Sequence, residues 1–185
     1  MPTSQELYAL KQIDRNNSET APVVKSLVSK VKEPVSATLT RTFGTTAYVA
    51  GASYGGRGVF TDVGSVGQSL FINDFQVIIN ITTIPSGMSL AVVFYSKDED
   101  SKVTGASVSD GSLITNTFPN ACTPAEGYSL TLSVNKGKVF GVAKNIRFIT
   151  PLEATSLWWY LEAKATFTSA ANGETMTAKA SCEVY

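Results

Sequence analysis

The stretch that decides the fold runs from Ser156 to Tyr185 and has the sequence SLWWYLEAKATFTSAANGETMTAKASCEVY. Apolar residues alternate with mostly polar ones along both of its halves. Successive side chains of a β-strand point to opposite faces, so this period of two predicts two long strands, each with one apolar face. The expected inward residues are Leu157, Trp159, Leu161, Ala163, Ala165 and Phe167 on the first strand, and Met176, Ala178, Ala180, Cys182 and Val184 on the second.

The segment between these two strands contains the pair Asn172-Gly173. Both residue types tolerate the positive φ angles of a tight turn, so we expect the two strands to form a hairpin. A lone hairpin is not stable in water. Its apolar face must therefore pack against a second sheet that earlier residues supply.

The composition is typical of one globular domain without a strong net charge. Of the 185 residues, 43% are hydrophobic and 16% are charged, and the 15 basic residues equal the 15 acidic ones. A balanced charge does not attract a polyanion, so nucleic acid is not an expected direct partner. The apolar runs are too short to span a bilayer and the first residues lack a secretion signal. We therefore expect synthesis in a cytoplasm and no membrane contact.

The chain has no histidine and two cysteines, Cys122 and Cys182. Without histidine the commonest general base near neutral pH is missing, which argues against an enzyme. Two cysteines are too few for a structural zinc site, which needs about four ligands, so neither a metal nor a cofactor is expected. Separate buried thiols are favoured over a disulfide in a protein made in the cytoplasm.

Residues 1–34 have a pattern unlike the rest and are predicted to form an N-terminal arm, short and helical or extended. The spacing of Thr3 and Glu6 is that of a capping box, which predicts a first helix over residues 4–14. A second amphipathic helix is predicted from Val23, ending before Pro34. The arm either packs on its own β domain or lies on another subunit, and the pattern leaves both open. Its candidate contact residues are Leu7, Leu10, Val24, Leu27 and Val28.

Strand patterns continue almost without interruption from Val35. Long strands are predicted over residues 71–81 and 88–95, joined as a hairpin by the turn at residues 84–87. The second of them is apolar on both faces, as in a central strand or in one that faces a partner subunit. Three further strands are predicted at 111–115, 129–134 and 139–149, with a hairpin turn at residues 135–138.

Two segments invite a ligand-binding hypothesis that their spacing does not support. Residues 54–58 are dense in glycine but lack the order and the following helix of a phosphate-binding loop, so a flexible turn is expected there. The acidic cluster at residues 97–102 does not follow the spacing of a calcium-binding loop, and a solvated loop is expected instead.

These strands, with no helices between them, predict an all-β domain over residues 35–185. Eight to ten strands with turns at short intervals are typical of an antiparallel two-sheet β-sandwich, here jelly-roll-like because long loops cross between strands. The lack of helices between strands excludes a doubly wound or a (β/α)-barrel fold.

Three short motifs resemble a family of tailed-bacteriophage and prophage proteins. They are Thr38-Leu-Thr-Arg41 with Thr45-Thr-Ala-Tyr-Val-Ala-Gly51, then Gly87–Tyr95, and finally Leu157–Ala163 with Ala171–Met176. The family's opening pattern is TR-P-x-D-T-T-A-Y-x-A-G-D, from which this chain departs at Thr42, Gly44 and Ala52. Members are capsid-associated cement or decoration proteins with a β-sandwich fold. The likeness covers residues 37–185 and does not extend to the arm.

The resemblance implies a non-enzymatic virion structural protein on the capsid exterior, whose partner is the major capsid protein and whose expected oligomer is a trimer. The polar face that carries Trp158 and Tyr160 is then the candidate subunit contact. The alternative is a carbohydrate- or receptor-binding module of a tail or head fibre, for which Trp158, Trp159 and Tyr160 offer a stacking platform. An enzyme is the third and least favoured hypothesis.

Overall fold

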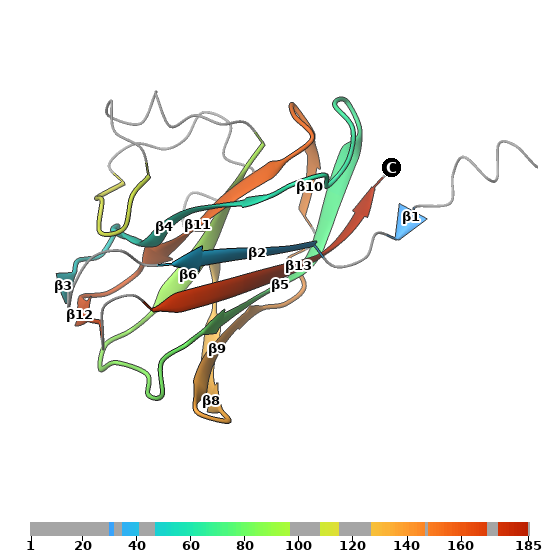
Figure 1. Cartoon of the computed structure of the whole chain (residues 1–185). Coiled ribbons are helices and arrows are strands. Elements are labelled where there is room, and N and C mark those ends of the chain that lie inside the picture. The colour runs from blue at the N-terminus through green and yellow to red at the C-terminus, as the bar shows by residue number, and fades with distance from the viewer. Residues whose placement is uncertain are drawn as a thin grey trace, which may run out of the picture. The chain divides into compact units, whose positions relative to one another are not determined.

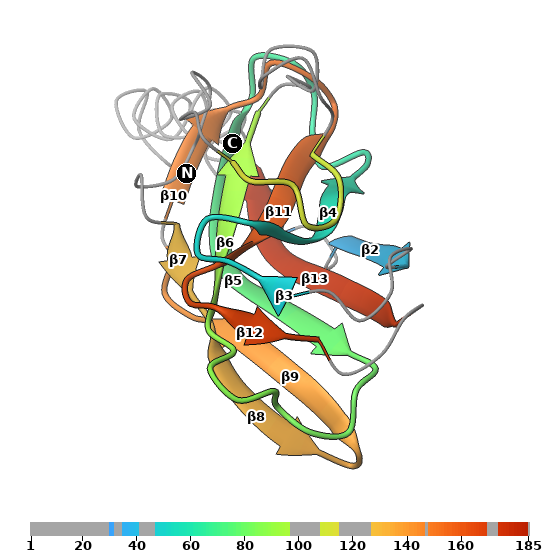
Figure 2. The ribbon, with the colours of Figure 1, turned by 90° about the vertical axis from the view of Figure 1, so that its left-hand side faces the viewer.

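The computed structural model (Figures 1 and 2) describes residues 30–31, 35–40, 47–96, 108–114, 127–146, 148–169 and 174–184. In this part of the chain every regular element is a β-strand. Residues 31–184 form one compact unit. The strands are β1 (Lys30–Val31), β2 (Val35–Thr40), β3 (Ala47–Tyr48), β4 (Ser53–Phe60), β5 (Ser69–Ile79), β6 (Leu90–Tyr95), β7 (Tyr128–Ser129), β8 (Thr131–Asn135), β9 (Lys138–Ala143), β10 (Phe148–Pro151), β11 (Leu157–Ala163), β12 (Phe167–Thr168) and β13 (Thr175–Val184).

The unit is a sandwich of two antiparallel sheets, which confirms the predicted fold class. In the large sheet β13 and β5 are central. β2 pairs with β13, β10 pairs with β5, and β9 and then β8 continue the sheet beyond β5. The other sheet has four strands in the order β4-β11-β6-β7, and β3 with β12 makes a small separate pair. The chain passes repeatedly from one sheet to the other, as in a jelly roll.

The core lies between the two sheets and is rich in aromatic rings. Phe75 of β5 is fully buried at its centre, with ring centroids 5.4 Å from Trp159 of β11 and 5.6 Å from Phe94 of β6. Phe60 of β4 stacks on Trp159 at 5.7 Å and meets Phe75 edge to face at 6.4 Å. Such stacked and edge-to-face pairs stabilise a core beyond the burial of their area.

The alternation of the terminal stretch predicted these inward faces correctly. All the expected inward residues of β11 and β13, together with Phe167 of β12, are buried, but Ala165, which was also expected to face inward, lies in the bend between β11 and β12 and is only half-buried. In β5 the pattern holds for Phe75, Val77 and Ile79, but Phe71 is only half-buried. The register between β5 and β13 shifts at Ser181/Cys182, so the inward phase changes there and Leu70 and Ile72 face the core.

Both predicted long hairpins are wrong. β11 pairs with β4 and β6, while β13 pairs with β2 and β5, so the two halves of the terminal stretch belong to different sheets. The chain bends at Lys164-Ala165 and forms the short strand β12 before it reaches β13. Likewise β5 and β6 lie in different sheets and do not pair. The strand predicted over residues 88–95 begins only at Leu90, but its expected central position is confirmed, since residues 90–95 are all buried between β11 and β7.

The hairpin predicted at residues 135–138 is confirmed. Asn135 of β8 is the register partner of Lys138 of β9, and the two residues between them, Lys136 and Gly137, have φ angles of 48° and 68°. Positive φ at both central positions defines a type I′ turn, whose twist suits a two-residue hairpin. By contrast, the strand predicted at 111–115 is limited to an isolated bridge between Leu113 and Ala52.

The glycine-dense segment 54–58 belongs to strand β4 and not to a loop. Gly55 and Gly56 have φ angles of 86° and 81°, and the register with β11 shifts at Tyr160/Leu161 opposite them, which is a β-bulge. Only glycine adopts such angles without strain. The sequence signal was genuine, but its cause is a bulge in a strand.

Several predictions concern residues outside the described ones. These are the first helix of the arm, most of the second, the acidic segment 97–102, and Cys122. Lys30 and Val31, the end of the second predicted helix, form the short strand β1 instead. Cys182 is buried in the core. Within the described part of the chain no helix is long and apolar enough to cross a membrane.

Candidate partner-contact surface

The outer face of the four-stranded sheet is covered by the protein's own chain. Val93 and Tyr95 of β6 and Tyr160 of β11 form a second apolar cluster with Val108, and Ile114 and Trp158 pack against it. Tyr160 is only 4% exposed. Residues 108–114 thus supply the apolar cover that sequence analysis assigned to a partner subunit.

Asp110 anchors this covering segment at the edge of β4. The same carboxylate oxygen, Oδ1, accepts two hydrogen bonds. One comes from the Tyr48 hydroxyl at 2.6 Å and the other from the Gly55 main-chain N–H at 2.7 Å. Main-chain hydrogen bonds join β4 to the segment, from Arg57 N to the Val108 oxygen at 3.0 Å and from Gly111 N to the Ser53 oxygen at 2.7 Å. The edge of β4 is therefore already paired.

The two strand residues chosen as candidate contacts are consequently structural in large part. Tyr160 lies beneath residues 108–114, and Trp158 is half-buried with its ring stacked on Tyr95 at a centroid distance of 6.4 Å. Trp159 points to the opposite face and is fully buried. The three aromatic residues therefore do not form an exposed stacking platform. The arm residues Leu7, Leu10, Val24, Leu27 and Val28 lie outside the described residues.

The environment of Tyr160 favours its neutral form. Burial raises the pKa of the Tyr160 hydroxyl well above its ordinary value of 10.0, and the nearby carboxylate of Glu162 raises it further. Glu162 in turn pairs with Lys164, with 3.0 Å between the charged atoms. Tyr160 therefore stays protonated over the ordinary pH range, as expected of a structural residue and not of a group that transfers protons.

A second polar group is buried at the end of the sandwich near β3 and β12. Glu174 is 4% exposed and accepts a hydrogen bond from the Tyr54 hydroxyl at 3.0 Å. The Tyr54 ring packs against Tyr48 and Phe167. The carboxylate fixes an aromatic corner whose residues come from β3, β4 and β12, and this corner includes Tyr48 of the opening motif.

The outer face of the large sheet offers a broad surface of a different kind. Side chains from four strands form one cross-strand row on it, given by the register as Lys179, Gln76, Val142 and Thr131. The neighbouring row contains Thr38, Thr177, Ile78, Phe140 and Ser133. Ile78, Phe140 and Val142 are half-buried apolar groups among hydroxyl and amide side chains.

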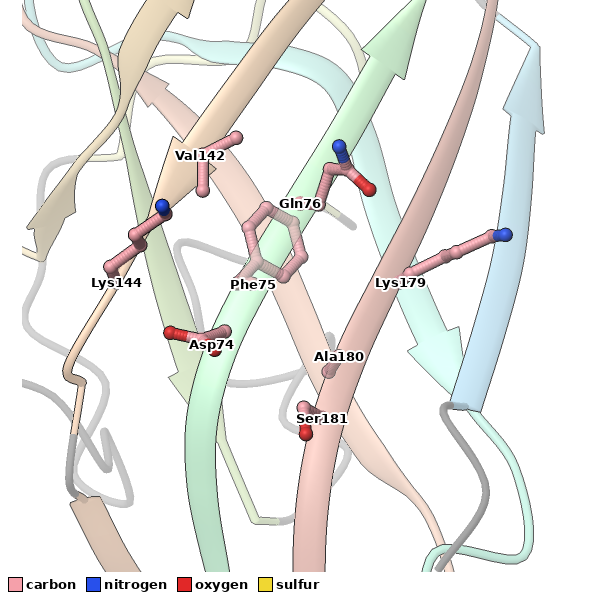
Figure 3. A pocket seen from close by; sticks show the side chains of 8 residues that line it. All are labelled: Asp74, Phe75, Gln76, Val142, Lys144, Lys179, Ala180 and Ser181. Atoms are coloured by element: carbon pink, nitrogen blue, oxygen red, sulfur yellow. The ribbon is translucent and has the colours of Figure 1, made fainter.

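A groove of about 440 Å³ runs between β9, β5 and β13 on this face (Figure 3). Figure 3 shows Lys144 and Lys179 on opposite sides of strand β5, whose residues 74–76 border the groove, while the Phe75 side chain itself is buried in the core. Asp74 accepts a hydrogen bond from the Asn145 main-chain N–H at 3.2 Å, beside Lys144. A second groove of about 510 Å³ shares Val142 and Lys144 and extends over β8. Together these residues define what we call the outer groove.

The outer groove could not be predicted from the sequence, because the period of two identifies outward positions but not which strands adjoin. Gln76, Val142 and Lys179 come from three distant strands and become neighbours only through the pairing of β5 with β9 and β13. The only signal in the sequence was that the outward positions of these strands include apolar residues such as Val142 among polar ones.

The described residues contain no group of three or more Cys, Asp or Glu side chains that could hold a metal ion. Comparison of the chain with family models, with curated proteins and with solved structures found no match.

Proposed function

We propose that this chain is a non-enzymatic virion structural protein that binds the capsid lattice of a tailed phage from the outside and stabilises it. The structural observation that carries the proposal is the outer groove and the face around it. The motif resemblance, which is a property of the sequence alone, supplies the class of partner, the major capsid protein.

The composition of this face suits contact with another protein. Protein interfaces combine an apolar centre with a polar rim. Here Ile78, Phe140 and Val142 lie centrally, hydroxyl and amide groups surround them, and the charged residues that line the groove are Asp74, Lys144 and Lys179. A flat face of this kind suits a repeated lattice contact better than the capture of a charged polymer.

A protein of this class acts by mass action. Each copy that binds the assembled lattice lowers the free energy of that state relative to the disrupted shell. Modest interfaces of roughly 1,000 Å², repeated over the particle, are sufficient for a large total effect. The trimer expected from the sequence remains a prediction, and the arm remains a candidate attachment segment.

The experiment that tests the proposal introduces Val142→Arg into the groove and compares it with Val66→Arg. Val66 is 64% exposed on a turn and lies outside both parts of the groove, so it is a matched control. We expect Val142→Arg to lower the number of copies per particle and the temperature at which particles release DNA. Val66→Arg should leave both unchanged. Full occupancy by the Val142→Arg protein would contradict the proposal.

The receptor-binding alternative also has one observation in its favour, which is the hydrogen-bonding lining of the groove. Gln76, Lys179 and Ser181 offer donors and acceptors beside the apolar side chain of Val142, and small-ligand sites also combine apolar lining with a few polar groups. Adsorption distinguishes the two functions. If the protein is a capsid stabiliser, particles that lack it should adsorb normally but release DNA at a lower temperature. If it binds a receptor, such particles should fail to adsorb but release DNA at the usual temperature.

A further inference from the structure

Strand β8 is an edge strand of a kind that natural proteins usually protect. It forms the outer side of the large sheet next to β9 (Figures 1 and 2), and its sequence TLSVN contains no charge and no proline. Charged residues, proline and bulges are the usual means that prevent an edge from pairing with another chain. The edge of β4 is covered by residues 108–112, and β2 lies against β4. Among the described residues no main chain pairs with the outer side of β8.

The register of the β8–β9 hairpin determines which main-chain groups face outward. A two-residue turn is flanked by a hydrogen-bonded pair of residues, here Asn135 and Lys138. Along an antiparallel ladder, hydrogen-bonded pairs alternate with non-hydrogen-bonded pairs. Asn135, Ser133 and Thr131 therefore direct their N–H and C=O groups toward β9. The N–H and C=O groups of Leu132 and Val134 point away from the sheet.

We propose that β8 pairs antiparallel with β8 of a second copy of this chain, about a two-fold axis that passes through Ser133. In this register Ser133 lies opposite Ser133 of the second copy, and Leu132 lies opposite Val134. Each Leu132–Val134 pair exchanges two main-chain hydrogen bonds, so all the outward groups of both residues are satisfied in both copies. An isologous contact of this type closes a dimer and exposes no further edge.

The side chains of β8 fit this register on both faces. Val134 is 49% exposed although it lies on the inward face, and the pairing places it against the half-buried Leu132 of the second copy. On the outer face Ser133 meets Ser133, and Thr131 meets Asn135, with no like charges opposite each other. The self-complementary pattern is the reason for choosing a second copy of this chain over an unrelated peptide.

The contact is small, because five residues of an edge bury far less than the roughly 1,000 Å² of a stable interface. We therefore expect a dimer that dissociates at low concentration and is populated at about 100 µM or above. This inference goes beyond the proposed function, and its tests use the purified full-length chain without particles. If the β8 dimer is not found, the proposed capsid function is unaffected, and if the capsid function fails its test, the β8 dimer is unaffected.

A single-cysteine crosslink tests the register directly. In a Cys122→Ser background, whose remaining Cys182 is buried in the core, Ser133→Cys places two accessible thiols opposite each other at a Cα separation of about 4.5 Å, within the range that a disulfide spans. Asn135→Cys is the matched control, since its thiols are separated by about 13 Å along the strands. We expect mild oxidation at high concentration to give a covalent dimer with Ser133→Cys and not with Asn135→Cys. Equal crosslinking of both, or of neither, would overturn the proposal.

Sedimentation measures the association itself. Val134→Pro removes one outward N–H without affecting the β9 ladder, and Val134→Lys adds a charge to the edge. We expect both variants to remain monomeric at concentrations where the parent chain dimerises, whereas Val66→Lys should behave like the parent. A parent chain that stays monomeric up to about 500 µM, or a Val134→Lys protein that still dimerises, would show that β8 does not join two copies.

Discussion

Gly58 of β4 and Trp159 of β11 are register partners, and the indole ring of Trp159 occupies the space that a β-carbon on residue 58 would take. The largest side chain of the core thus lies flat against a neighbouring strand that lacks a side chain at this point. The ring also packs against Phe60 and Phe75. Glycine in β4 is therefore a packing requirement as well as a conformational one.

Gly58→Ala should lower the free energy of unfolding by about 1–3 kcal/mol, the usual cost of adding a methyl group to a filled core. Trp159→Phe in the same chain should recover part of this loss because the smaller ring leaves room for the methyl group. Urea denaturation of the two single variants and the double variant measures the coupling. Strictly additive effects would mean that the two residues do not share this space.

Gly55→Ala should destabilise the protein more than Gly67→Ala. Both glycines have nearly the same positive φ, 86° and 85°, so alanine meets a left-handed φ at both positions. A β-carbon at residue 55 would collide with the methyl end of Met176, whereas nothing lies within 4 Å of one at residue 67. The difference in unfolding free energy isolates the collision. Met176→Ala should reduce the difference, and an unchanged difference would contradict this account.

Asp110→Ala should loosen the cover over Tyr160. The substitution removes the acceptor of the Tyr48 hydroxyl, whose residue is fully buried, and a buried donor that loses its acceptor costs about 1–3 kcal/mol. We expect lower thermal stability and a red-shifted emission from the half-buried Trp158. Ser112→Ala, which removes only an exposed hydrogen bond within the same segment, is the control and should have little effect.

Stability should fall as the pH rises above about 10. The folded state raises the pKa of Tyr160 above its ordinary value, so between the two values the unfolded chain loses this proton while the folded chain keeps it. The unfolded state then binds fewer protons, and the free energy of unfolding decreases by up to about 1.4 kcal/mol per pH unit. The stabilising effect is fully present below pH 10. Tyr160→Phe should flatten this dependence, measured by urea denaturation at pH 8 to 12. An unchanged slope would contradict the assignment.

Deletion of residues 1–29 should leave a folded β domain, because residues 31–184 form a compact unit. If the arm attaches the protein to capsids, as its separate composition suggests, the shortened protein should no longer bind particles. Near-UV circular dichroism checks the fold, and copy number on purified particles checks attachment. Parental occupancy after the deletion would exclude the arm as the attachment segment.

The faces of the strands could be predicted from the sequence, while the partners of the strands could not. Alternation placed Trp159 and Met176 in the core because a period of two depends only on local geometry. It did not indicate that β11 and β13 lie in different sheets, since the bend at Lys164-Ala165 carries neither proline nor glycine. Pairing is a long-range property, and two amphipathic strands in succession fit a hairpin and a crossing between sheets equally well.

The candidate site was the least predictable part. Tyr160 lies on the outward face by its position in the strand, yet residues 108–114 bury it, and those residues come from a segment that periodicity does not place. The outer groove requires the pairing of β5, β9 and β13. By contrast, the type I′ turn at Lys136-Gly137 could be predicted because its geometry is encoded within four residues.

The pairing of β2 with β13 has a consequence for how the protein is made. β2 (Val35–Thr40) has its ladder partner in residues 175–184, so about 135 residues must be synthesised before the two can meet. At roughly 5–20 residues per second, a ribosome needs several seconds or more to supply them. During this interval β5 also lacks its neighbour β13, so the main-chain N–H and C=O groups along that side of β5 have no native partner. The nascent sandwich therefore depends on its last described strand for closure, and a ribosome that stalls before residue 175 releases a chain that is prone to aggregate.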